Sequence, residues 1–120
     1  MCLVKTHKWP KITLRPKLVY KVLEIQKGVL STPHVGMIVK LGETIKAKKW
    51  WNIAVGEKEI WGEGVHAYVD LRRAETARQC GWARRIFIAE IPVFTLYWMG
   101  DSYDIAAKRM KIIKELEGYD

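Results

Sequence analysis

The feature that most limits the fold of this 120-residue chain is a series of short apolar runs separated by Gly, Pro and turn-forming residues. The clearest run, residues 18–25, is rich in β-branched and aromatic side chains and ends at Lys27-Gly28, which predicts a central strand. Further strands are expected at 44–47, 64–69, 85–91 and 94–99, with a hairpin-like excursion between 29–30 and 37–41. No run approaches the roughly 20 apolar residues of a membrane-spanning helix, so no membrane partner is expected.

One segment has a strong helical signal. Asp70 stands where an N-cap belongs, Leu71–Cys80 has an apolar side that includes Ala74, and Gly81 follows as a stop signal. Cys80 is expected to be a small buried apolar residue at the end of this helix.

These elements predict the α+β class, with a largely antiparallel sheet and one main helix, 71–80. Residues 18–120 are expected to form this single domain, since the length suits one core and the composition is 49% hydrophobic. Residues 1–17 are predicted to be a basic extended arm, because Pro10 and Pro16 disfavour helix at the residues before them. The N-terminus has no apolar signal sequence and the two cysteines form no CxxC, which indicates a cytoplasmic protein.

The positive charge is concentrated in the first half of the chain. The formal net charge is +8; residues 1–60 carry 12 Lys and Arg against four Asp and Glu, whereas residues 61–120 carry nine of each. A basic segment of this kind is either a lysine-rich surface that maintains solubility or a binding surface for a polyanion.

Metal binding and common phosphate-binding loops have no support in the sequence. His7, His34, His66, Cys2 and Cys80 are scattered without the spacing of metal ligands, so no metal is expected. Neither GxGxxG nor GxxxxGK[ST] occurs, which disfavours Rossmann and P-loop enzymes.

Six tryptophans are a high number for this length. Trp98 and one of Trp50 and Trp51 are assigned to the core. Aromatic rings beside cations can also bind nucleic acid, because a base stacks on the ring while Lys or Arg contacts phosphate. This favours, as one alternative, sequence-independent nucleic-acid binding through Lys8, Trp9, Lys48, Lys49, Trp50 and Trp51.

Three stretches together resemble a group of small phage and prophage proteins. They are Met1-Cys2-Leu3 before the Tyr20-Lys21-Val22-Leu23 strand, Gly64-Val65-His66-Ala67-Tyr68 with its following helix, and Ile91-Pro92 followed by Asp104-Ile105-Ala106-Ala107-Lys108. The resemblance implies a mobile-element origin and a strand at 108–113 after a short turn at 104–107. Propensity alone favours a helix over 104–116.

A more distant similarity is to ADP-ribosyltransferases. Gly62-Glu63-Gly64-Val65-His66 before an alanine-containing helix is similar to the strand and helix beside the NAD site of that family, and Val19-Tyr20-Lys21 is similar to the first strand of its arginine-containing branch. The resemblance implies a split sheet, NAD as cofactor, and Lys21, His66 and Asp104 at the three usual catalytic positions. Those positions hold Arg, Tyr and Glu in the family, so this chain would be a degenerate enzyme.

The leading functional prediction is a non-catalytic, cofactor-free binding protein of phage type. It would capture a nucleotide-like anion or a host defence factor in the host cytoplasm, and a counter-defence role fits that origin. The enzyme of the preceding paragraph and nucleic-acid binding are the alternatives. The predicted ligand-binding residues, gathered by the strand at 64–69 and the start of the helix, are Lys21, Trp61, His66, Tyr68, Arg72 and Arg73.

Overall fold

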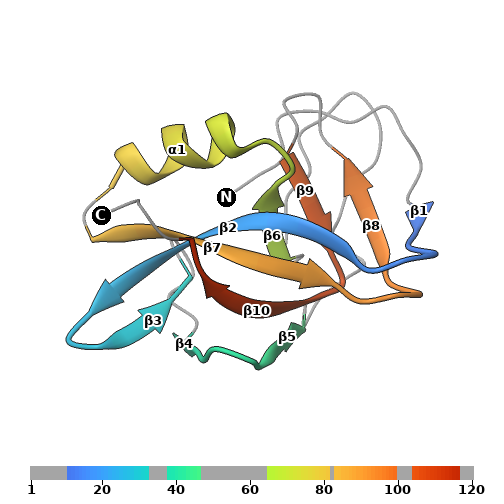
Figure 1. The fold of residues 1–120 in the computed structure, drawn as a ribbon, viewed down its shortest axis with the longest axis horizontal. Helices are drawn as coiled ribbons and strands as arrows, with labels where there is room; N and C mark the ends of the chain where they lie inside the picture. The colour runs from blue at the N-terminus through green and yellow to red at the C-terminus, as the bar shows by residue number, and fades with distance from the viewer. Residues whose placement is uncertain (1–10, 33–37, 47–64, 82, 100–103, 117–120) are drawn as a thin grey trace.

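The described part of the chain folds into a ten-stranded antiparallel sheet with one helix packed against it (Figure 1). The computed structural model describes residues 11–32, 38–46, 65–81, 83–99 and 104–116. The strand order is β1-β8-β9-β6-β2-β7-β10-β5, and β3 pairs with β2 and β4. The elements are β1 (Lys11–Ile12), β2 (Lys17–Gln26), β3 (Val29–Ser31), β4 (Ile38–Val39), β5 (Thr44–Lys46), β6 (Val65–Tyr68), α1 (Leu71–Gln79), β7 (Arg84–Ile91), β8 (Leu96–Met99), β9 (Asp104–Ala107) and β10 (Arg109–Glu115).

Strand β2 is the centre of the sheet, as its sequence predicts. It pairs with β7 from Lys17↔Ile91 to Glu24↔Arg84, over almost its whole length. It then turns into β3 through Lys27-Gly28, where both residues have positive φ (52° and 77°). A two-residue loop with this geometry matches the twist of the strands that it joins, which explains why a glycine stands there.

The single helix of the described residues begins at Leu71 as predicted and ends at Gln79, with Cys80, the last residue of the predicted range, as its C-cap. The Oδ1 atom of Asp70 accepts a hydrogen bond from the backbone N–H of Arg72 at 3.1 Å, which caps the first turn. At the other end, Arg84 Nη1 donates to the carbonyl of Ala77 at 3.0 Å. A Cβ atom on Gly81 would collide with the Arg84 side chain, so glycine leaves room for this second cap. Within the described residues no helix has the length and apolar character needed to cross a bilayer.

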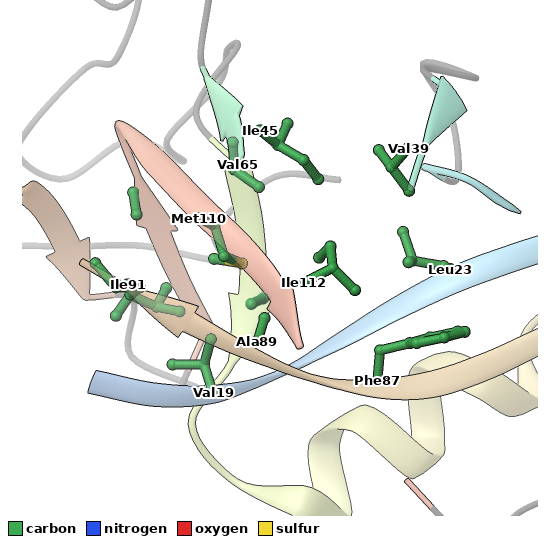
Figure 2. Close-up of a cluster of buried hydrophobic side chains, with 13 residues drawn as sticks. Val19, Leu23, Val39, Ile45, Val65, Phe87, Ala89, Ile91, Met110 and Ile112 are labelled. Carbon is green, nitrogen blue, oxygen red and sulfur yellow. The ribbon is translucent and has the colours of Figure 1, made fainter. Parts of the chain in front are cut away.

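The sheet has a hydrophobic cluster on each face. Along β2, Val19, Lys21 and Leu23 point to one face, whereas Tyr20 and Val22 point to α1. The cluster under α1 is small, and Ala74 and Ala77 bring the helix close to Val22, Tyr68 and Ile86. The larger cluster lies on the other face, where side chains from strands far apart in the sheet order converge because the sheet curls (Figure 2). It comprises Val19, Leu23, Val39, Ile45, Val65, Ala67, Phe87, Ala89, Ile91, Ile105, Ala107, Met110 and Ile112.

Two predictions about the second half of the chain are wrong and two are confirmed. Asp104–Ala107 is strand β9 rather than a turn, because it fills the space between β6 and β8. The strand expected at 108–113 is confirmed as Arg109–Glu115, in place of the helix that propensity alone favours, because β7 and β5 pair with its two edges. Cys80 is exposed rather than buried, and its thiol donates to the carbonyl of Thr76 at 3.2 Å. Trp98 is buried, as assigned.

The described end of the predicted N-terminal arm is attached to the sheet. Lys11 and Ile12 pair with Tyr97 and Leu96, which makes β1 an edge strand. The residues of the arm before Lys11 lie outside the described part of the chain.

Candidate functional site

Lys21 lies where strands β2 and β6 separate. The two strands share one register pair, Tyr20↔Tyr68. Beyond this pair the side chain of Lys21, 6% exposed, extends across the gap and its Nζ donates to the backbone carbonyl of His66 at 2.5 Å. The ammonium therefore supplies a donor to a carbonyl at the point where the backbone ladder ends. Desolvation by burial lowers the pKa of Lys21 from 10.5 to about 8.

The side chains of His66 and Tyr68 point to the opposite face from Lys21. Val65 and Ala67 belong to the larger cluster, so the alternation of β6 places His66 and Tyr68 on the α1 face, where both are buried. In register, His66 lies beside Ala106 of β9, which in turn lies beside Trp98 of β8.

The other predicted residues have different positions. Arg72 and Arg73 are exposed in the first turn of α1. Asp104 lies on β9, directly opposite Tyr68 in register. The structure therefore places His66, Tyr68 and Asp104 on neighbouring strands, and the ammonium of Lys21 donates to the backbone carbonyl of His66. Trp61 and the six residues predicted for nucleic-acid binding, Lys8, Trp9, Lys48, Lys49, Trp50 and Trp51, lie outside the described residues.

A basic hollow that the sequence reasoning missed lies at a different place on the sheet. It has a volume of about 270 Å³ and is lined by Lys46, Phe94, Thr95, Lys108 and Arg109. These residues come from β5, from the turn between β7 and β8, and from the junction of β9 with β10. Among the described residues, no carboxylate forms an ion pair with any of its three cations.

Arg109 is held in the basic hollow by the turn between β7 and β8. Its Nε donates to Thr95 Oγ1 at 3.0 Å, and its Nη2 donates to the carbonyl of Val93 at 3.1 Å. A guanidinium has five N–H donors, so these two bonds fix its plane and leave further donors for an anion. Such a planar, oriented donor suits the paired oxygens of phosphate or carboxylate.

Lys46 faces Arg109 across the pairing of β5 with β10. The two are register partners, and both point away from the larger cluster because their neighbours Ile45 and Met110 point into it. Like charges directly opposite each other on one face of a sheet are destabilising. A bound anion would remove this repulsion.

The sequence holds only a weak signal for this hollow. Arg109 and Lys111 alternate with Met110 and Ile112, which marks one polar face of a strand. The partner strand of β10 cannot be read from the sequence, so the meeting of Lys46 with Arg109 could not be predicted.

Comparison of the chain with protein-family models, with curated proteins and with solved structures finds no match. Among the described residues, no group of three or more His, Cys, Asp and Glu side chains is placed to hold a metal ion.

Proposed function

We propose that this protein is a non-catalytic binding protein that captures a nucleotide-like anion in the basic hollow. The observation that carries the proposal is the convergence of Lys46, Lys108 and Arg109 around a hollow of about 270 Å³, with no carboxylate partner among the described residues. Cations gathered in a concave site raise the local concentration of anions and bind them by charge-assisted hydrogen bonds.

Binding is favoured over catalysis by the arrangement around Lys21. Its ammonium is engaged with the backbone of β6 on the face opposite the His66 side chain. The Lys21 ammonium thus links β2 to β6 through a hydrogen bond to the backbone, whereas a catalytic group would have to contact the substrate. The phage-type resemblance adds a host defence protein as a second class of partner.

Replacing Arg109 by alanine should weaken the binding of tripolyphosphate by about tenfold or more, because hydrogen bonds to a charged group contribute about 1.5–3 kcal/mol. Isothermal titration at low salt measures this effect. Because Arg109 also supports a turn, the exposed Lys108→Glu variant is tested in parallel, and it should lose affinity to at least the same extent.

The matched control is Arg72→Ala, which removes an exposed arginine on α1 that does not line the hollow; it also separates this proposal from the sequence prediction that Arg72 binds the anion. Its affinity for tripolyphosphate should equal that of the wild-type protein. The proposal fails if the wild-type protein binds no tripolyphosphate, or if Arg72→Ala weakens binding as much as the hollow variants do.

A second candidate is a degenerate enzyme with an ADP-ribosyltransferase-like split sheet. It is supported by the placement of Lys21, His66 and Asp104 on three consecutive strands of the sheet, β2, β6 and β9, with β6 between the other two. Under this candidate, the protein incubated with labelled NAD and cell lysate releases nicotinamide, and Asp104→Asn lowers that rate at least tenfold. Absence of both released nicotinamide and transferred label rejects it.

A further inference from the structure

Phe94 stands at a position that folding alone does not explain. It lies in the turn between β7 and β8 with φ of 58°, and its side chain is 67% exposed. A positive φ is sterically unfavourable for a bulky residue, and turns that need it normally use Gly or Asn. Because most of the ring is exposed, it contributes little hydrophobic stabilisation to the fold. Residues held in such conformations concentrate at functional sites.

The turn that carries Phe94 is firmly held. The backbone N–H of Phe94 donates to the carbonyl of Thr13 at 2.8 Å, and Thr13 Oγ1 donates to the carbonyl of Pro92 at 2.6 Å. The backbone N–H of Thr95 donates to Thr13 Oγ1 at 2.9 Å. Both threonines are buried, so the base of the turn is fixed while the ring of Phe94 is left in solvent.

The same turn joins the aromatic ring to the cations. Arg109 donates hydrogen bonds to Val93 and Thr95, the residues on either side of Phe94. Phe94, Thr95 and Arg109 all line the basic hollow. An exposed ring next to an oriented guanidinium is the combination that a nucleotide needs, because the base stacks on the ring while the phosphates bind the cations.

We infer that the ligand of the basic hollow is a nucleoside polyphosphate whose base stacks on Phe94 while its phosphates bind Lys46, Lys108 and Arg109. This inference rests on the proposed function and adds the part of the ligand that is not charged. Stacking requires only the flat face of a base, so binding should depend on the presence of a base more than on its identity.

The test compares ATP with tripolyphosphate, two ligands that share the triphosphate chain. ATP adds the nucleoside and carries one negative charge fewer, so charge alone would favour tripolyphosphate. Isothermal titration should show that the wild-type protein binds ATP about fivefold or more tightly than tripolyphosphate, as expected for one stacked base. Phe94→Ala should abolish this preference and leave the affinity for tripolyphosphate unchanged. Phe94→Trp, which restores a flat ring, should retain the preference for ATP.

Leu14→Ala is the control, because it removes an exposed apolar side chain (76% exposed) that does not line the hollow. It should retain the preference for ATP, and thermal unfolding monitors whether each variant is folded. If tripolyphosphate binds but folded Phe94→Ala prefers ATP as the wild-type protein does, the stacking inference is overturned and the proposed function stands. If neither ligand binds the wild-type protein, the proposed function itself fails.

Discussion

The free energy of unfolding should rise by about 2 kcal/mol from about pH 7.5 to about pH 9.5 because of Lys21 alone. The pKa of this amine is about 8 in the folded protein, and its ordinary value of 10.5 applies to the unfolded chain. Between these values the unfolded chain binds more protons than the folded protein, so stability increases with pH. Below both values the ammonium is charged in both states, and the folded protein bears the full cost of burying it.

Urea unfolding of the wild-type protein and of Lys21→Met at these two pH values isolates this contribution. The difference in free energy of unfolding between them should change by about 2 kcal/mol, since the variant cannot titrate at this position. Lys40→Met, at an exposed lysine between β4 and β5, is the control and should follow the wild-type protein. An identical pH dependence for the wild-type protein and Lys21→Met would show that the amine is not buried in the native state.

Replacing Phe87 by alanine should lower the free energy of unfolding by about 3–5 kcal/mol. Phe87 is 2% exposed in the larger cluster, and its strand β7 is paired on both sides (Figure 2). The rigid surroundings cannot close over the space that the ring would leave, so the loss includes both transfer energy and a cavity.

The chain offers a matched control, because Phe94 is its other phenylalanine and is 67% exposed. Phe94→Ala should change the free energy of unfolding by less than about 1 kcal/mol in the same urea experiment, as expected for a surface substitution. Equal losses for the two variants would contradict the packing described for β7.

The parts of the fold that the sequence predicts are those with local signals. The β-branched run of β2 and the Asp70 cap of α1 are recognisable within a few residues, and the α+β class follows from them. Strand β9 was missed because Ala106 and Ala107 have low strand propensity. They are small enough to be completely buried between β6 and β8, so tertiary packing determines their conformation.

The candidate site was less predictable than the fold. His66, Tyr68 and Lys21 are close in the sheet, but strand alternation sends the Lys21 side chain to the other face, and the gap that it fills cannot be seen from one sequence. The basic hollow depends on the pairing of β5 with β10, which places Lys46 opposite Arg109. These strands are far apart in the sequence, so neither their pairing nor its register could be predicted from it.

The single register pair between β2 and β6 gives the sheet a seam. On one side lie β1, β8, β9 and β6, and on the other lie β2, β7, β10 and β5. Few backbone hydrogen bonds cross this line, so the two halves are joined mainly by side chains and by α1, which contacts β2, β6 and β7 (Figure 1). Because α1 contacts strands on both sides of this line, a change in the angle between the two halves would also change the packing of α1 against β2, β6 and β7.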